Sequence, residues 1–476
     1  MSQRAKILKG SFLVTLTAVV SYASGFARNM VFARILTKAD FGVVATIAMM
    51  MSLFEWVSKM GMGQLVMQAK EGDTPEFLSV AHWMQFVVGA FSGVVIFLAA
   101  TPVAEFFKIP EQVWVLRMLA LLPILRGLEH LHVLRLMRDM RYTPAMLAET
   151  IPQIIITLGA WPVTMWLQDA RAVLLLLLVK TALTDIMTHC YGAWNYRWSF
   201  ERQHIQTILK FGWPLLLSGL LMFVIFQGDR ILVGRFYLMN DLGVYAAAAT
   251  ISLAPIEILG QVMNSVLLPI LGKQQDDYVA FHSQYRLAIE ITGIVAIAYG
   301  VFCMLGSEAL MVVVFGKKYT GSGVVLAWFA ISGALRMLRT APSIAALAFG
   351  DSKNLMISNI FRTLGFLPAL IAVLYGQPLW VVAAAAVVGE GCACTASFSQ
   401  LSLRHKVPWS ASVGSVILTI IMVTISGLGA WISGIYQLSW SIGLISAIIC
   451  CTIAVLVGLS TFPGLRTQIV RLKPIR

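Results

Sequence analysis

Residues 21–36 read SYASGFARNMVFARIL and lie in an apolar run that extends over residues 10–33. A helix of roughly 20 residues crosses a hydrocarbon core of about 30 Å, so this run is long enough to span a membrane. Its polar side chains recur at spacings of four, three and four: Thr17, Ser21, Ser24 and Arg28. This periodicity predicts one polar stripe on an otherwise apolar helix, and such a stripe faces protein or water, not lipid.

The composition indicates that the whole chain is an integral membrane protein. Hydrophobic residues make up 59% of the 476 residues and charged residues 12%, whereas soluble domains are about 25% charged. The basic start MSQRAKILKG resembles that of a signal peptide. The apolar run after it, however, exceeds the usual length of roughly 7 to 15 residues, and a second span follows directly. We therefore expect the first span to be retained.

Polar residues, Gly and Pro divide the chain into about fourteen apolar spans. The spans of the first half are 10–33, 41–66, 79–100, 112–133, 143–167 and 171–193. A polar, aromatic segment follows at 194–210, with the character of an amphipathic piece on the membrane surface. The spans of the second half are 211–234, 243–270, 287–305, 321–349, 354–375, 378–402, 409–432 and 438–461. The sequence thus predicts an all-α membrane protein with about 14 transmembrane helices.

The distribution of Lys and Arg predicts the orientation. An even number of spans places both termini on one side of the membrane, and the loops on that side carry more Lys and Arg than the opposite loops. Because short cytoplasmic loops are enriched in these residues, both termini are predicted to be cytoplasmic. The same distribution accounts for the net charge of +13, so no nucleic acid is expected as a partner.

An internal repeat relates the two halves of the chain. The stretch FARILTKADFGVVATIA aligns with VGRFYLMNDLGVYAAAA at an offset of 201 residues, which matches Gly42 with Gly243. At an offset of 210, LRGLEHLHVLRLMRDMRYTPAM aligns with LRMLRTAPSIAALAFGDSKNLM, which matches Arg126 with Arg336. We expect the two glycines to permit a tight turn between the first two spans of each half.

The repeat predicts the domain organisation. Six spans and a linker precede the second half, so both halves have the same orientation, as in transporters with parallel repeats and a central site. We expect two homologous six-helix lobes around a central cavity. The expected boundaries are 1–193 for the N-terminal lobe, 194–210 for a cytoplasmic amphipathic linker, 211–402 for the C-terminal lobe and 403–476 for two extra spans and a basic tail.

Three motifs carry a resemblance to a known superfamily. The pattern S-x-x-x-G-F-x-R-[DN]-x-x-x-A-R-I in the first span is similar to the first helix of the lipid II flippases, although Asn29 stands where those proteins usually have Asp. QGDRILVGR at 227–235 and RDMRY at 138–142 resemble motifs of the polysaccharide transporter branch, the Wzx-type flippases of lipid-linked oligosaccharides. Both groups belong to the multidrug, oligosaccharidyl-lipid and polysaccharide exporter superfamily.

Arginines within the spans are the candidate substrate-binding residues. If all of them faced lipid they would cost on the order of 15 to 20 kcal/mol, so a cavity or buried carboxylates must receive them. Ion pairs that only hold helices together are one reading, and an anion site is the other. The planar guanidinium suits phosphate, because it offers paired hydrogen bonds to two oxygens. The candidates are Arg28, Arg126, Arg230, Arg336, Arg339 and Arg362.

The resemblance implies the identity of the anion, which the residues alone do not give. It implies an undecaprenyl pyrophosphate that carries a short oligosaccharide, with the polyprenyl chain left in the bilayer. Carboxylates within the spans are candidates for binding a coupling ion, Na⁺ or H⁺, because a desolvated carboxylate changes protonation state readily. The alternative for each is a charge partner for a neighbouring arginine. These candidates are Asp229, Glu257 and Glu129.

The sequence contains no enzymatic motif of the nucleotide-binding, zinc-protease or serine-hydrolase kind, and neither a metal nor an organic cofactor is expected. The resemblance implies a flippase in the bacterial inner membrane that works by alternating access. A polysaccharide polymerase and a chain-length regulator are candidate partners. A drug or cation exporter of the same superfamily is the first alternative, and an integral-membrane polymerase or ligase is the second.

Overall fold

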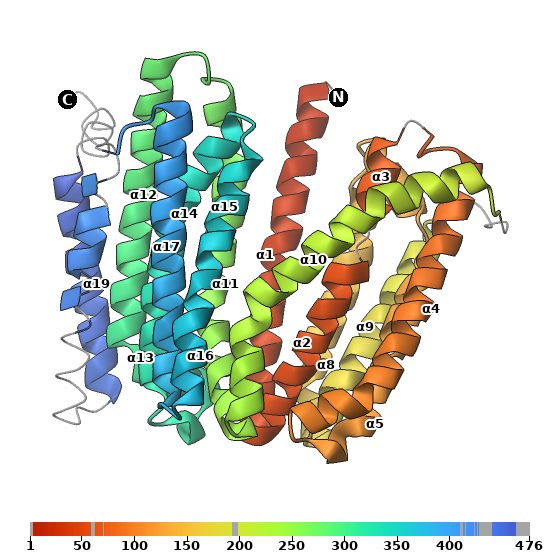
Figure 1. The fold of residues 1–476 in the computed structure, drawn as a ribbon, viewed down its shortest axis with the longest axis horizontal. Coiled ribbons are helices and arrows are strands. Elements are labelled where there is room, and N and C mark those ends of the chain that lie inside the picture. The colour runs from red at the N-terminus through yellow and green to blue at the C-terminus, as the bar shows by residue number, and fades with distance from the viewer. Residues whose placement is uncertain are drawn as a thin grey trace. The chain divides into compact units, whose positions relative to one another are not determined.

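The computed structural model describes residues 3–58, 62–69, 71–192, 199–409, 413–414, 416–422, 424–425, 427 and 440–462. The chain divides into two compact units, Met1–Gly243 (unit 1) and Val244–Arg476 (unit 2), and each is described by itself. All regular elements of the described residues are helices, as the sequence predicts (Figure 1). The lobe boundaries expected at 194–210 and 403 stay predictions, because a division into compact units does not test whether the two halves are homologous.

Unit 1 is a bundle of long helices with a few short ones between them. Its elements are α1 (Gln3–Ile35), α2 (Lys38–Ser58), α3 (Met62–Gln68), α4 (Pro75–Phe106), η1 (Pro110–Gln112), α5 (Val113–Met118), α6 (Leu121–Gly127), α7 (His132–Arg138), α8 (Thr143–Leu167), α9 (Arg171–Cys190) and α10 (Arg202–Phe236). Helix α8 packs against α1 and α9, and α4 packs against α6. Thr74 caps α4, because its hydroxyl accepts from the backbone N–H of Phe77.

The expected span 112–133 is not one helix, so this prediction is wrong. The segment forms η1, α5, α6 and the first turn of α7. Pro123 lies in the first turn of α6 and Gly127 ends it. A Cβ on Gly89 of α4 would lie 2.3 Å from the carbonyl oxygen of Pro123, so the two backbones are in contact. The short α6 therefore packs directly against the backbone of α4, and a side chain at position 89 of α4 would prevent this contact.

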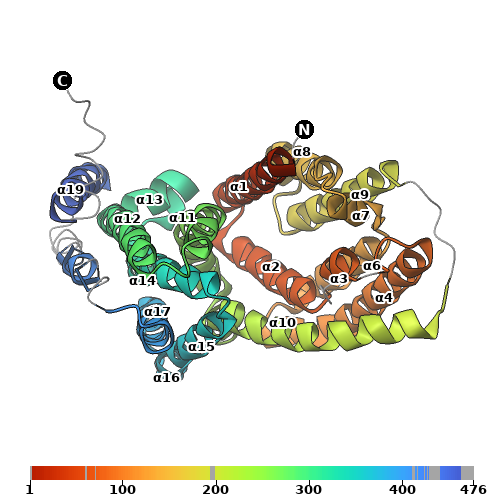
Figure 2. The ribbon, with the colours of Figure 1, turned by 90° about the horizontal axis from the view of Figure 1, so that it is seen from above.

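The expected surface segment 194–210 continues into the next span. Residues 193–198 lie outside the described part of the chain, but α10 runs without a break from Arg202 to Phe236. Figure 2 shows α10 running along one side of α2, α3 and α4, with which it is in contact. A Cβ on Gly219 would lie 2.2 Å from the carbonyl oxygen of Trp56, so α10 and α2 meet backbone to backbone.

The two glycines matched by the repeat lie inside helices and make a close approach, not a turn. Neither has a positive φ. A Cβ on Gly42 would lie 2.2 Å from the carbonyl oxygen of Met239, and a Cβ on Gly243 would lie 2.0 Å from that of Lys38. Met239 lies 201 residues after Lys38, as Gly243 does after Gly42. The starts of α2 and α11 therefore touch through equivalent residues, as in a two-fold symmetric contact.

Unit 2 is built around α14. Its elements are α11 (Met239–Gly272, which begins in unit 1), α12 (Tyr278–Leu305), α13 (Ser307–Phe315), η2 (Lys317–Tyr319), α14 (Gly323–Ala348), α15 (Ser352–Arg362), η3 (Thr363–Gly365), α16 (Phe366–Leu374), α17 (Leu379–His405) and α19 (Trp440–Thr461). Helix α14 packs against α12 and α17, and small buried residues such as Ala330, Ala334 and Ala341 allow this close packing. Asp277 caps α12 and Asp351 caps α15 through their side chains.

Eleven helices or helix pairs among the described residues are long and apolar enough to cross a membrane. Three further spans were expected from the sequence. The span 10–33 lies in α1, the span 112–133 is broken, and the span 409–432 falls partly outside the described residues. The protein is therefore a multi-pass, all-helical membrane protein.

Candidate functional site

Arg28 on α1 faces α8. Its Nη1 atom donates a hydrogen bond to Thr157 Oγ1 at 3.1 Å. Gln153, one turn earlier on α8, accepts from the same nitrogen at 2.7 Å when its amide oxygen is turned toward Arg28. The polar stripe of the first span therefore faces protein at Arg28, as its periodicity predicts. Neutral oxygens accept these hydrogen bonds, which leaves the positive charge of the guanidinium in place.

Unit 1 contains a partly open cavity of about 780 Å³ that is lined by both polar and apolar side chains. Its wall includes His130 and these charged side chains: Glu55, Arg126, Glu129, Glu149 and Lys180. Arg126 Nη2 lies 2.9 Å from Glu55 Oε1, and Lys180 Nζ lies 2.8 Å from Glu149 Oε1. The wall thus contains three carboxylates and two cations. The arginines do not converge on this cavity as a purely positive set, because carboxylates balance the charge of the one arginine in its wall.

The break in the fourth expected span positions Arg126 and Glu129 at this cavity. Gln85 of α4 donates from Nε2 to the carbonyl oxygens of Arg126 at 3.0 Å and Glu129 at 3.2 Å. These carbonyls lie at and just after the C-terminal end of α6, where the regular i+4 donors are missing; the Arg126 carbonyl also accepts from the backbone N–H of Glu129 at 3.3 Å. The backbone N–H of His130 donates to Thr188 Oγ1 of α9 at 3.1 Å. Side chains of α4 and α9 therefore stabilise the interruption.

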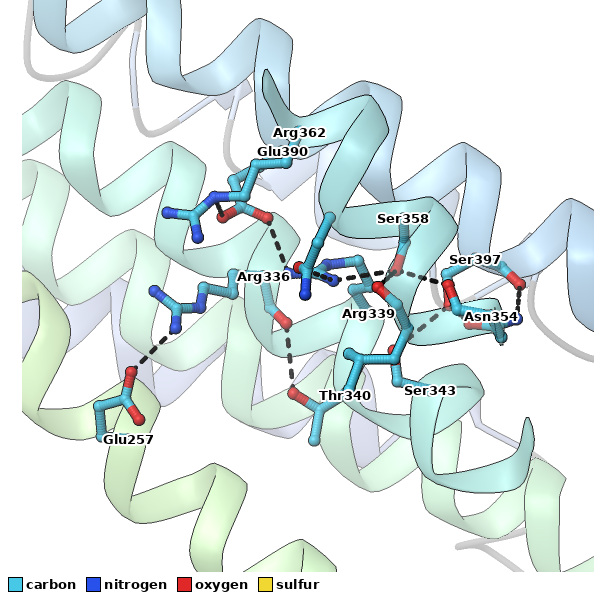
Figure 3. Close-up of polar contacts among 12 residues, drawn as sticks. Glu257, Arg336, Arg339, Thr340, Ser343, Asn354, Ser358, Arg362, Glu390 and Ser397 are labelled. Atoms are coloured by element: carbon cyan, nitrogen blue, oxygen red, sulfur yellow. Dashed lines mark hydrogen bonds and ion pairs between the residues drawn. The ribbon is translucent and has the colours of Figure 1, made fainter. Parts of the chain in front are cut away.

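Three predicted arginines lie together in unit 2, in two different environments (Figure 3). Arg336 of α14 pairs with Glu257 of α11, with Nη2 and Oε1 2.9 Å apart and side chains 15% and 35% exposed. Arg339 and Arg362 share Glu390 of α17, at 3.5 Å from Arg339 Nη2 and 2.7 Å from Arg362 Nε. The side chains of Arg339 and Glu390 are only 8% and 4% exposed.

The buried pair continues into a hydrogen-bonded network of neutral groups. Arg339 Nη1 donates to Ser358 Oγ at 3.3 Å and to Asn359 Oδ1 at 3.4 Å, which ties α14 to α15. Ser397 of α17 donates to Asn354 Oδ1 at 2.8 Å, and Asn354 Nδ2 donates back to the Ser397 carbonyl at 2.9 Å. Glu390 and these amides therefore join α14, α15 and α17 in the interior of unit 2 (Figure 3).

Arg230 and Asp229 lie next to each other on α10. Asp229 Oδ1 accepts from the backbone N–H of Arg230 at 2.8 Å, and Arg230 Nη1 donates to Gln227 Oε1 at 3.2 Å. Gln227 Nε2 donates to Ser52 Oγ of α2 at 2.9 Å. This places Arg230 beside the contact between α10 and α2.

The structure therefore brings Arg126 and Glu129 together in unit 1, and Arg336, Arg339 and Arg362 together in unit 2. Of the coupling candidates, Glu257 has the alternative role of a charge partner, since Arg336 binds its carboxylate. Sequence reasoning missed the neutral groups that line the unit 1 cavity, although their helical spacing on α9 is visible in the sequence: Thr181, Thr184 and Thr188.

Comparisons with known proteins identify relatives of this chain. Residues 31–323 match the model of a family described as "Polysaccharide biosynthesis protein". The chain is 21% identical over 381 residues to the lipopolysaccharide biosynthesis protein WzxC of Escherichia coli (strain K12), a match that covers 78% of this chain and 76% of that protein. It is 24% identical over 323 residues to the succinoglycan biosynthesis transport protein ExoT of Rhizobium meliloti (strain 1021), covering 64% and 62%.

Solved structures share the fold. A lipid II flippase MurJ in an inward closed conformation superposes with a TM-score of 0.74 and 14% sequence identity, over 97% of this chain and all of that one (100%). An inward-facing multidrug resistance transporter of the MATE family gives a TM-score of 0.67 at 17% identity, over 81% of this chain and 94% of that one. At these identities the likeness shows the fold alone.

Proposed function

Because the chain belongs to the polysaccharide biosynthesis protein family, we propose that it is a flippase for undecaprenyl-pyrophosphate-linked oligosaccharide. It moves repeat units of a surface polysaccharide from the cytoplasmic to the periplasmic leaflet of the bacterial inner membrane. The resemblance of the sequence to the polysaccharide transporter branch of its superfamily is confirmed by this family match, and its fold is that of the lipid II and multidrug transporters. The relatives with known names serve polysaccharide biosynthesis and transport.

The observation that carries this proposal is the position of Arg126. Its side chain is 31% exposed and lines a cavity of about 780 Å³, together with other charged side chains, in a multi-pass membrane protein. A guanidinium held within a membrane protein and open to a cavity is suited to a phosphate oxygen, because it presents two parallel N–H donors. The hydroxyls and carboxylates around it are the partners that sugar hydroxyls need.

The environments of the arginines divide them by role. We assign Arg126 and Arg336 to the pyrophosphate, because each is paired with one partly exposed carboxylate. Arg28 is assigned to the same anion, because its partners Thr157 and Gln153 are neutral. Arg230 stays a candidate beside them.

The other two predicted arginines have a different assignment. We place Arg339 and Arg362 in the framework of unit 2, since both bind a carboxylate that is only 4% exposed.

Transport by alternating access of the two lobes, with both termini in the cytoplasm, completes the proposal. Glu129 is the best placed of the coupling candidates, because it lines the unit 1 cavity, and a proton or Na⁺ is the coupling ion. A polysaccharide polymerase then consumes the translocated unit, with a chain-length regulator as a further partner.

One observation favours a second candidate function, the export of a cationic compound. The unit 1 cavity has three carboxylates against two cations in its wall, and a cation would complete that balance. Uptake of cationic dyes into inverted membrane vesicles separates the two functions. The flippase proposal expects no dye transport above that of vesicles without the protein.

The test of the flippase proposal uses Arg126→Ala and Arg336→Ala, each expressed at the native level in a strain that lacks the chromosomal copy. Both variants are expected to insert and fold, and to reduce surface polysaccharide at least tenfold. The reason is that each removes a donor pair that no neighbouring group replaces. Surface polymer is measured by gel electrophoresis and sugar analysis, and the amount of protein by immunoblotting of membranes.

Arg117→Ala is the matched control. Arg117 is an exposed arginine on α5 whose Nη2 donates to Thr101 Oγ1 at 3.3 Å, away from the cavity. This variant is expected to make normal surface polymer. Normal polymer from both Arg126→Ala and Arg336→Ala would contradict the assigned site.

A further inference from the structure

The ion pairs of Arg126 and Arg336 have the same geometry. In unit 1, Nη2 of Arg126 on α6 lies 2.9 Å from Oε1 of Glu55 on α2. In unit 2, Nη2 of Arg336 on α14 lies 2.9 Å from Oε1 of Glu257 on α11 (Figure 3). The same two atom types meet at the same distance in both units.

The internal repeat matches the two arginines, and the two glutamates lie close to equivalent positions without being matched by it. Arg336 lies 210 residues after Arg126, which is one of the two offsets of the repeat. Glu257 lies 202 residues after Glu55, one more than the other offset. Each half of the chain therefore presents an arginine from one helix to a glutamate from the helix that follows its first span. One such pair could arise by chance in packing, but its occurrence in both halves indicates a shared function.

A carboxylate and a phosphate make the same demand on a guanidinium. Both accept two parallel N–H donors through two oxygens, so a glutamate bound to an arginine occupies the position that a phosphate would take. Each glutamate holds the Nη2 group of its arginine at 2.9 Å, so the substrate anion cannot form a paired contact through that nitrogen unless the glutamate leaves.

The exposure of the pairs decides whether such an exchange is feasible. Glu55 and Glu257 are 40% and 35% exposed, so neither carboxylate is locked in the packed interior, and Glu55 lines the unit 1 cavity, into which it can turn when an anion replaces it. Partly exposed ion pairs are weak, on the order of two- to fivefold in an equilibrium constant. Glu390 is only 4% exposed between two arginines, and removing it from them would leave buried charges without compensation.

We propose that Glu55 and Glu257 are resident competitors of the substrate phosphate. Each glutamate holds its arginine while the site is empty, yields it to a pyrophosphate oxygen on binding, and takes it back as the pyrophosphate leaves. This inference rests on the proposed function and deepens it. Competition lowers the affinity for the substrate and speeds its release, which a flippase needs because it must let go of the lipid on the far side.

The test compares Glu55→Gln and Glu257→Gln with the wild-type protein in detergent. The amide keeps the size of the side chain and removes its negative charge, so the arginine is no longer held by a competing anion. Farnesyl pyrophosphate is the probe for binding, with uncharged farnesol as the control ligand. Each variant is expected to bind farnesyl pyrophosphate about two- to fivefold more tightly and farnesol as the wild type does.

A second readout separates competition from a structural role. In proteoliposomes that contain a purified lipid-linked oligosaccharide, both variants are expected to have a lower KM together with a lower kcat, because release is slowed. A purely structural glutamate would weaken binding or lower thermal stability when it is neutralised. Asp169→Asn is the matched control, since Asp169 is 32% exposed and also pairs with an arginine, Arg171, away from the cavity. Its affinity for the probe is expected to be unchanged.

The outcomes distinguish this inference from the proposed function. If Arg126→Ala and Arg336→Ala bind farnesyl pyrophosphate as tightly as the wild type, the arginine site itself is wrong. If these two variants lose affinity while Glu55→Gln and Glu257→Gln show unchanged or weaker binding, the arginine site stands and the competitor role is wrong.

Discussion

Two arginines one helical turn apart on α14 have opposite surroundings. Arg336 has a partly exposed glutamate as its partner, whereas Arg339 lies with Glu390 in the interior of unit 2. Their spacing in the sequence predicts one polar face that carries both charges. Only the positions of α11 and α17 around α14 show that the two charges meet different partners.

The buried carboxylate gives a prediction for stability. Glu390→Gln removes the negative charge that lies between Arg339 and Arg362, and so leaves two guanidinium groups uncompensated in the interior. We expect the free energy of unfolding to fall by about 3 to 5 kcal/mol. Thermal unfolding in detergent measures this, with Glu111→Gln on exposed η1 as the control that leaves stability within about 0.5 kcal/mol. Equal stability of the two variants would contradict the framework role of Glu390.

Asp351 gives a prediction for the dependence of stability on pH. Burial by itself raises the pKa of Asp351, but a hydrogen bond from His405 and the charge of Arg404 outweigh it and hold this pKa below its ordinary value. Because the pKa is lower in the folded state, the stabilisation is present above the unfolded pKa of about 3.9 and is lost as the pH falls through the folded pKa.

The measurement is the difference in Tm between the wild type and Asp351→Asn in detergent, followed from about pH 6 downward. The difference is expected to be constant above the ordinary aspartate pKa and to shrink below about pH 4. A difference that grows on acidification would reverse the sign of the pKa shift and contradict the ion pair seen with Arg404 at 3.1 Å.

At the scale of the helices, apolar length predicts the spans well and predicts their interruptions poorly. The long spans over α4, α8, α9, α12 and α17 follow from hydropathy alone. The break in the span at 112–133 is stabilised by Gln85 of α4, which donates to its backbone, and by Thr188 of α9, which accepts from its backbone. Those partners are distant in the sequence, so only Pro123 and Gly127 hint at the break.

The glycines at the starts of α2 and α11 give a prediction at this scale. Gly42→Ala or Gly243→Ala would place a methyl group about 2 Å from a backbone carbonyl oxygen of the facing helix, and a backbone atom cannot rotate away. We expect each variant to lose about 1 to 3 kcal/mol of stability. The measurement is thermal unfolding of the purified protein.

Gly260→Ala is the control for the helical glycines. Nothing lies within 4 Å of a Cβ built on Gly260, which also lies in α11. This substitution is expected to leave stability unchanged or to raise it by up to about 1 kcal/mol, because Ala favours a helix. If Gly42→Ala and Gly243→Ala behave in the same way as this control, the close approach of the two helix starts is wrong.

For the whole molecule, the sequence predicts class and family better than it predicts the site. Composition and span length predict an all-helical membrane protein, and the motifs at 138–142 and 227–235 indicate a polysaccharide transporter, in agreement with the match to the polysaccharide biosynthesis protein family. The sequence could not tell which arginines are neutralised in the interior. That depends on Glu55, Glu257 and Glu390, which lie 71, 79 and up to 51 residues away along the chain from the arginines they bind.

The internal repeat relates single residues, helix contacts and the two halves of the chain. It matches Gly42 with Gly243 at the contact between α2 and α11, and it matches Arg126 with Arg336, each of which pairs with a glutamate. A transporter with two equivalent halves can offer the same anion contact from both, which suits a substrate with two phosphate groups. The flippase proposal therefore requires both Arg126 and Arg336.

The most direct measurement is transport of a purified undecaprenyl-pyrophosphate-linked oligosaccharide in proteoliposomes, with and without imposed Na⁺ and proton gradients. The account predicts that the wild-type protein moves the lipid between leaflets and that the Arg126→Ala, Arg336→Ala double variant, inserted in equal amount, does not. Transport by the double variant at the wild-type rate, or no transport by the wild type under any gradient, would contradict it.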